Sequence, residues 1–321
     1  MAFLWPPAGN GAIMNEVVST SWWHVTIIIT LGFAPGFFWL WYIYRRDLEP
    51  EPLHLIRNCF IAGMGAVIAV GLLGAPAKAL PSWVVAVIVA PVIEECIKFG
   101  ACYAVAYRDK DFNEPMDGVV CAVAVALGFA SLENVFYLFD AMKQGISSLT
   151  FTTLVRAFFT VPGHALFGIM WGYALGRAKF EDQQRGRRII AVGLLTGIAA
   201  HSFFNLMCVL EPLWAFGMMF FIPVAWGLAN RKILRATELS PHSHITRLKA
   251  KVIALKESLA LGPNSSRWFD NQFVVVLLLF FLFFPAGFYA LYKNTTFSKP
   301  EKVAYVALWF VCAISFQAWT K

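Results

Sequence analysis

The sequence predicts an all-α protein, a polytopic bundle of membrane-spanning helices, and three observations predict it. Of its 321 residues, 59% are hydrophobic and 16% are aromatic, whereas only 14% are charged. Water-soluble domains usually have about a quarter of their residues charged. Apolar runs of about 20 residues, the length that crosses a bilayer as a helix, recur along the chain. Lys and Arg gather in alternate connections between these runs.

The apolar runs predict about nine transmembrane helices. In chain order they cover about residues 22–44, 56–76, 83–107, 117–139, 151–176, 188–210, 212–230, 271–292 and 302–319. Only Glu211 and Pro212 separate the sixth run from the seventh.

The positions of the basic residues predict the orientation of the bundle. Most of the 26 Lys and Arg residues lie in the connections on one side, among them Arg45, Arg108, Arg177 and those between 231 and 267. Because cytoplasmic connections carry the excess of positive charge, the N-terminus is expected outside and the C-terminus in the cytoplasm. The net charge of +7 follows from these connections, so we expect no nucleic-acid partner.

The chain is expected to divide into four parts. Residues 1–21 form an extracytoplasmic tail, which has no basic residue and therefore no sign of a cleavable signal. Residues 22–230 form a seven-span body, with its motifs between 90 and 210. Residues 231–270 form a cytoplasmic basic amphipathic segment, and residues 271–321 form two appended transmembrane helices.

The amphipathic segment has a stripe of apolar residues at helical spacing, namely Ile245, Leu248, Val252, Leu255 and Leu259. Steps of three and four place these side chains on one face of a helix. Such a helix lies along the cytoplasmic membrane surface or packs on the bundle's own loops, and the pattern leaves both interpretations open.

The stretch APVIEECIKF, residues 90–99, places three charges inside the third predicted span. Charged groups within a membrane helix are costly unless they pair or serve a function. Glu94 and Lys98 are four residues apart and share one helix face. Glu95 is offset from Glu94 by about 100° around the helix. This pattern is typical of an active site or of a structural ion cluster that holds helices together.

The next three spans carry further ionisable or amide side chains. Glu133 lies in GFASLENVFY, Arg156 and His164 lie in the fifth span, and His201 and Asn205 share one face in HSFFN. Counting about 1.5 Å of rise per residue, we expect the acids and histidines to reach overlapping depths near the middle of the membrane. Imidazoles and carboxylates are ligands of zinc-like ions, and they also hold and deprotonate water.

Taken together, these motifs resemble the PrsW intramembrane proteases, which belong to the superfamily of CAAX prenyl endopeptidases and bacteriocin-processing enzymes. The resemblance rests on EECIK (94–98), NEPMDG (113–118) leading into GFASLENVFY, GHALFG (163–168) and HSFFN (201–205), in the family's order. The prenyl-protease branch usually shows EExxxR, but Phe99 stands at that arginine position here. The resemblance implies a peptidase that cleaves a bond within or near the membrane.

The resemblance also implies roles for individual residues. The expected catalytic residues are Glu94, Glu95, His164, His201 and Asn205. One of the two adjacent glutamates would be the general base, and Asn205 would donate to the oxyanion. The expected supporting residues are Lys98, Glu133 and Arg156, the last contacting the substrate or a loop acid. The resemblance leaves two mechanisms open, a metal-dependent one and attack by a glutamate-activated water without an obligatory metal. In the metal-dependent mechanism, zinc or another divalent metal would be held by His164, His201 and Glu133. No organic cofactor is expected.

By resemblance, the substrate is a single-span membrane protein, such as an anti-sigma factor, and the enzyme lies in a bacterial plasma membrane. The sequence leaves the oligomeric state unassigned. Two other functions compete with the peptidase. A catalytically inactive scaffold or immunity-type protein would keep the polar cluster for stability. An ion-coupled transporter would use it as a relay, but transporters often contain two related halves, and no internal repeat is visible.

Overall fold

The computed structural model describes residues 22–210, 214–240, 272, 275, 284–295, 297–307 and 309. All regular structure in this part of the chain is helical, as expected. The chain separates into two compact units, Met1–His244 and Ile245–Lys321. The predicted N-terminal tail and the apolar stripe of the amphipathic segment lie outside the described residues.

The first unit contains the predicted body. Its helices are α1 (Trp22–Tyr44), α2 (Leu53–Gly74), η1 (Ala75–Ala79), α3 (Ser82–Val84), η2 (Val85–Val89), α4 (Ala90–Val105), α5 (Pro115–Lys143), α6 (Ile146–Val155), η3 (Arg156–Thr160), α7 (Val161–Ala178), α8 (Gln183–Val209) and α9 (Trp214–Leu239). In the second unit, α12 covers Phe284–Lys293. The helix predicted to end near residue 230 continues to Leu239.

Five helical stretches in the described residues are long and apolar enough to cross a membrane: Trp22–Tyr44, Leu53–Ala77, Pro115–Lys143, Ile146–Ala178 and Gln183–Val209. They correspond to the first, second, fourth, fifth and sixth predicted spans. The third and seventh predicted spans are also helical, and the last two are only partly described. Nine spans and their orientation therefore stay predictions.

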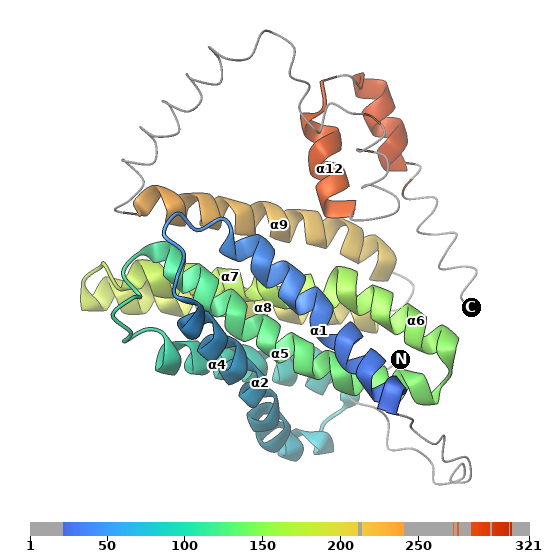
Figure 1. Ribbon diagram of the computed structural model, residues 1–321, viewed down its shortest axis with the longest axis horizontal. Helices are drawn as coiled ribbons and strands as arrows, with labels where there is room; N and C mark the ends of the chain where they lie inside the picture. Colours follow the sequence, from blue (N-terminus) through green and yellow to red (C-terminus); the bar gives the residue numbers. More distant parts are fainter. Residues whose placement is uncertain are drawn as a thin grey trace. The chain divides into compact units, whose positions relative to one another are not determined.

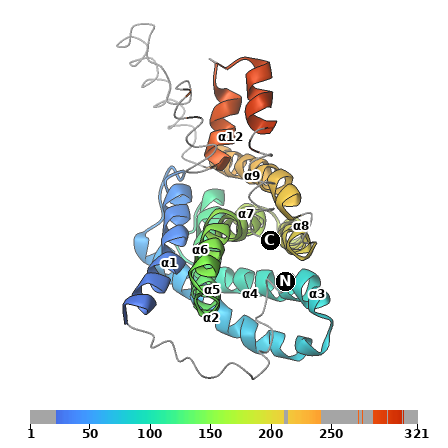
Figure 2. The ribbon, with the colours of Figure 1, turned by 90° about the vertical axis from the view of Figure 1, so that its right-hand side faces the viewer.

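Helices α5 and α7 form the centre of the first unit, and α1 and α8 pack on opposite sides of this pair (Figures 1 and 2). Glycines let the two central helices approach closely. A Cβ atom built on Gly172 would lie 2.6 Å from the carbonyl oxygen of Gly118, and one built on Gly176 would lie 2.3 Å from that of Pro115. This close packing buries nearly all of α7 and brings its polar residues to the interior.

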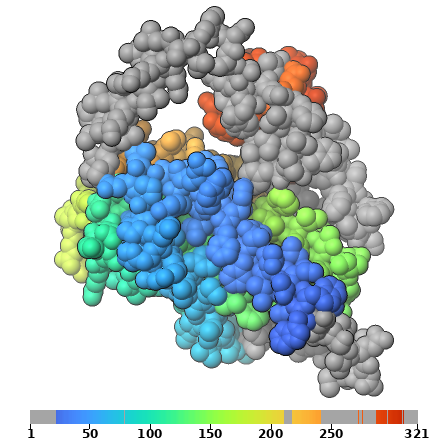
Figure 3. All heavy atoms as spheres, viewed as in Figure 1, coloured from blue at the N-terminus to red at the C-terminus, as the bar shows by residue number. Residues whose placement is uncertain are grey.

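The outer helices show large apolar side chains on their exposed faces. Trp22, Phe37, Leu72 and Val192 are all more than half exposed, and Figure 3 shows the face formed by α1 and α2 in shades of blue. An apolar outer surface of this extent suits contact with lipid. The protein is therefore an integral membrane protein.

Candidate active site

The ionisable residues singled out from the sequence meet between α4, α5, α7 and α8. Glu94, Glu95 and Lys98 come from α4, His164 comes from α7 and His201 comes from α8. All five are buried, with between 0% and 4% of their surface exposed. The spacing of the EECIK motif therefore places its three charges at a helix interface.

Lys98 lies at the centre of this group. Its Nζ atom donates to Glu95 Oε1 at 2.8 Å, to Glu94 Oε2 at 3.2 Å and to His164 Nδ1 at 3.1 Å. The ammonium also lies 4.2 Å from the centre of the Phe129 ring. An ammonium has donors only, so His164 Nδ1 is the acceptor and the ring carries its proton on Nε2.

The two adjacent glutamates differ in how they are held. Both oxygens of Glu95 are used: Oε1 contacts Lys98 and His201 Nδ1, the latter at 2.9 Å, and Oε2 accepts from Trp171 Nε1 at 2.9 Å. Among the described residues, Glu94 has contacts through Oε2 alone, which accepts from Lys98 and lies 4.0 Å from His201 Nε2. Glu95 is therefore fixed in place, whereas Glu94 keeps an oxygen available.

The orientation of His201 follows from its contact with Glu95. A carboxylate only accepts, so His201 Nδ1 carries a proton, and in the neutral tautomer Nε2 has its lone pair on the side of Glu94. The ring also stacks on Phe167, with centroids 4.8 Å apart and planes 17° from parallel. These contacts orient the ring so that Nε2 faces the side of Glu94, where a water, a substrate or a metal would meet it.

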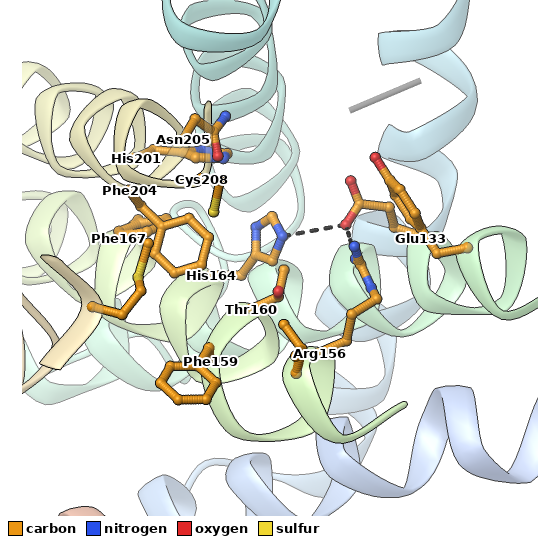
Figure 4. Close-up of a pocket in the computed structure, with 13 residues that line it drawn as sticks. Glu133, Arg156, Phe159, Thr160, His164, Phe167, His201, Phe204, Asn205 and Cys208 are labelled. Atoms are coloured by element: carbon orange, nitrogen blue, oxygen red, sulfur yellow. Dashed lines mark hydrogen bonds and ion pairs between the residues drawn. The ribbon is translucent and has the colours of Figure 1, made fainter. Parts of the chain in front are cut away.

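A second ion pair borders the first group. Arg156 Nη2 donates to Glu133 Oε2, and His164 Nε2 lies 3.4 Å from the same oxygen, as the dashed lines in Figure 4 show. The guanidinium also lies 4.0 Å from the Tyr137 ring centre. Arg156 thus pairs with an acid of a neighbouring helix rather than with the loop acid considered from the sequence.

A small cavity of about 40 Å³ opens beside these side chains. Polar groups of Glu133, Arg156, His164, His201 and Asn205 line it together with aromatic rings (Figure 4). One water needs about 10–15 Å³ on the same measure. The cavity therefore has room for a few water molecules next to the histidines.

Asn205 has a structural partner that its motif did not reveal. Its Nδ2 atom donates to the Ala86 carbonyl at 2.9 Å. Ala86 lies in the π-helical turn η2, where each N–H bonds the carbonyl five residues earlier, as Ala90 does with Val85. The next donor in this register would be Pro91, which has no N–H. Asn205 therefore satisfies the carbonyl that Pro91 leaves unpaired.

The residues fit a zinc-like ion by donor type. Glu94, Glu95, His164 and His201 each offer one ligand atom within 4.8 Å of the others, and imidazole with carboxylate suits zinc. Glu133, a ligand expected from the sequence, is not in this group. Lys98 contacts three of these four residues, so an ion and the ammonium compete for the same atoms.

Sequence reasoning missed three aromatic members of the site. Trp171 donates to Glu95, Phe167 stacks on His201 and Phe129 covers Lys98. Trp171 follows His164 by seven residues, which is two turns on the same helix face. This spacing could have indicated that Trp171 lies at the site. Phe129 and Phe167 offered none, because apolar residues are abundant throughout these spans.

Comparison with known proteins gives one consistent result. The family model described as PrsW family intramembrane metalloprotease matches residues 51–228. A protein named Protease PrsW from Geobacillus kaustophilus is 31% identical over 220 residues, covering 65% of this chain and 92% of the relative. Another of that name from Bacillus subtilis is 28% identical over 218 residues, covering 66% and 97%. No solved structure matches the chain.

Proposed function

The chain belongs to the PrsW family of intramembrane metalloproteases, and from this premise we propose how its site cleaves a peptide bond. We propose that Glu94 is the general base and that Glu95 and His201 position the attacking water. The observation that carries this division is the unequal use of the two carboxylates: both oxygens of Glu95 are engaged, but only one of Glu94.

The water would lie between Glu94 and His201 Nε2, which are 4.0 Å apart at their nearest atoms. The imidazole lone pair accepts one hydrogen of the water, and the free oxygen of Glu94 takes the proton that leaves as the water attacks the carbonyl carbon. Glu94 then passes that proton to the amine of the departing peptide. General acid–base transfer of this kind contributes about 10²–10⁴-fold to a rate.

Neighbouring residues support the charge of Glu94 and the tautomer of His201 that the reaction needs. Glu95 holds the proton of His201 on Nδ1, because its carboxylate accepts from that atom. Lys98 balances the charge of the glutamates. The amide of Asn205 has a second N–H besides the one given to Ala86, and this donor would stabilise the oxyanion of the tetrahedral intermediate.

A zinc-like ion, when bound, would be held by Glu94, Glu95, His164 and His201 and would supply a water of lowered pKa. Lys98 would have to leave the three residues that it contacts. The contact between Glu95 and His201 Nδ1 would also help to hold the ion. A histidine that binds a metal through one ring nitrogen commonly donates its other N–H to a carboxylate, which orients the ring.

We further propose that the substrate is a single-span membrane protein, such as an anti-sigma factor, and that cleavage takes place in a bacterial plasma membrane. Access of the substrate to a site made of buried side chains favours an extended peptide over a folded domain. The bacterial origin of the relatives supports the location.

The test compares membrane fractions of cells that produce the wild type, Glu94→Gln or Asp140→Asn at equal levels. Asp140 lies on α5 and pairs with the exposed Lys143, so its variant is a matched loss of one carboxylate outside the site. Mass spectrometry of new peptide ends within or beside transmembrane segments should find the same products with the wild type and Asp140→Asn.

The products should be absent with Glu94→Gln. If they appear in equal amounts with a folded Glu94→Gln protein, Glu94 is not the base. If no transmembrane product depends on the wild-type protein, the proposed substrate class is wrong.

A further inference from the structure

A second group of acids lies away from the candidate active site, where α1 leads into α2 and where α5 begins (Figure 1). Asp47 and Glu51 belong to the connection between α1 and α2. Glu114 is the N-cap residue of α5 and Asp117 lies in its first turn. All four are buried, with exposed fractions of 6%, 3%, 1% and 1%.

The four carboxylates face one another. Asp47, Glu114 and Asp117 each offer an oxygen within 4.8 Å of the other two, and the carboxyl of Glu51 contacts that of Asp117. Within the part of the chain that the structure describes, three oxygens are buried without a hydrogen-bond partner, namely Asp47 Oδ2, Glu51 Oε1 and Glu114 Oε1. Buried acceptors without a donor are rare, and each requires an explanation such as a bound ion.

Local helix capping explains only part of this arrangement. Asp117 Oδ2 accepts from the backbone N–H of Glu114 at 2.7 Å as part of a capping box, and Ser240 Oγ donates to Glu114 Oε2. These contacts engage one oxygen of each residue. They give no reason for Asp47 and Glu51 to be buried beside them.

The four acids also have no ion-pair partner in the described part of the chain. Among the described residues, no Lys or Arg forms an ion pair with any of the four acids. Lys179 is near, but its Nζ atom donates to the carbonyls of Tyr107 at 2.9 Å and Phe112 at 2.6 Å. Burial and then the neighbouring acids raise the pKa of Asp47 to about 8.

We propose that Asp47, Glu51, Glu114 and Asp117 bind a hard divalent cation, Ca²⁺ or Mg²⁺. All the donors are oxygens, with no histidine or cysteine, and such a set favours these ions over zinc. Oxygen ligands lie 2.3–2.6 Å from Ca²⁺, so two ligands of one ion are at most about 5 Å apart. The oxygens of Asp47, Glu114 and Asp117 lie within 4.8 Å of one another, close enough to share one ion. The ion ties the connection between α1 and α2 to the start of α5.

The test measures thermal unfolding of the purified full-length protein in detergent, stripped of metal by EDTA and titrated with CaCl₂ or MgCl₂. Ions that bind only the folded protein raise its Tm in a saturable way. We expect this rise for the wild type and for Glu49→Gln, a control that removes an exposed acid from the same connection. The ion that acts at the lower concentration identifies the preferred cation.

Asp47→Asn should lose the response to the added ion. In buffer above pH 8, where the Asp47 carboxyl is ionised, the Tm of this variant without added ion should exceed that of the stripped wild type, because one of the mutually repelling charges is gone. Added ion should raise its Tm little or not at all. A variant that merely folds badly would show a lower Tm in both conditions, so this pair of results separates ion binding from misfolding.

The active site is tested separately with His201→Ala, which removes a candidate metal ligand there and should keep the full Ca²⁺ or Mg²⁺ response. The proposal is overturned if neither ion raises the wild-type Tm. It is also overturned if Asp47→Asn responds like the wild type, or if the response disappears in His201→Ala. None of these results depends on whether the protein cleaves a substrate.

Discussion

His201 Nδ1 lies 2.9 Å from Glu95 Oε1, and this contact decides which nitrogen of the ring is available for chemistry. Glu95 is completely buried and also accepts from Lys98 and Trp171. The carboxylate is thus fixed, and it fixes the imidazole in turn. The two adjacent glutamates of one helix thereby have separate tasks, since only Glu94 keeps an oxygen for proton transfer.

Replacing each glutamate by glutamine should reveal these separate tasks. Glu94→Gln removes the proposed base and should lower kcat by about 10²–10⁴-fold. Glu95→Gln loosens the histidine and should lower it by about 10–100-fold, the usual effect of losing such an orienting partner. Initial rates of cleavage in proteoliposomes measure both. A larger loss in Glu95→Gln than in Glu94→Gln would reverse the proposed roles.

Trp171→Phe should destabilise the protein through one lost hydrogen bond. The indole N–H donates to Glu95 Oε2 at 2.9 Å, and phenylalanine keeps an aromatic ring but offers no donor. An unsatisfied buried acceptor costs about 1–3 kcal/mol, and more when it is charged. The free energy of unfolding in a denaturant titration measures the loss.

Trp41→Phe is the control, because Trp41 is 52% exposed and lies outside the site. It should unfold nearly as the wild type does. Equal stability of the Trp171 and Trp41 variants would mean that the contact with Glu95 contributes nothing to the fold.

Local spacing in the sequence was enough to predict part of the site. Glu94 and Lys98 pair because residues four apart share a helix face, and this holds wherever α4 packs. The contact between His164 on α7 and Lys98 on α4 was not predicted as such. The sequence indicated only that the two residues lie at similar depths in the membrane. Because those depths overlapped, a common site was expected, but its individual contacts were not.

Contacts that depend on the rotation of a helix about its axis, or on a π-helical turn, could not be predicted from the sequence pattern. Whether Arg156 reaches Glu133 depends on how α5 is turned toward η3, and hydropathy does not determine that angle. The partner of Asn205 depends on the π register before Pro91. Asp47 and Asp117 meet only when α1, α2 and α5 are assembled, and no spacing in the sequence links the two residues.

Two glycines of α2 should respond in opposite directions to alanine. A Cβ atom at Gly63 would lie 2.0 Å from the backbone oxygen of Val125 on α5, whereas one at Gly65 would meet nothing within 4 Å. Gly63→Ala should therefore lose about 1–3 kcal/mol through overpacking. Gly65→Ala should gain about 0.5–1 kcal/mol, because alanine favours the helix.

Unfolding curves of these two variants, recorded side by side, measure the close packing of α2 against α5. A Gly63→Ala protein as stable as Gly65→Ala would show that the two helices lie farther apart than the structure has them.

Lys98→Met should reveal competition between the ammonium and a metal ion. Without metal, the variant leaves two buried carboxylates with no partner charge, and breaking a buried ion pair in this way costs about 3–5 kcal/mol. With zinc, the ion takes the place of the ammonium among Glu94, Glu95 and His164. The variant should then bind zinc more tightly than the wild type and recover part of its lost stability.

Zinc retained after dialysis, together with the Tm at rising zinc concentration, measures the competition. Lys143→Met is the control, since the Lys143 side chain is 72% exposed, and it should bind zinc like the wild type. Lys98 is a competitor only if its loss increases zinc binding, because an ammonium and a divalent ion cannot both occupy the centre of the same three side chains. Weaker zinc binding by Lys98→Met would instead mean that the lysine holds the carboxylates in the positions that the ion requires.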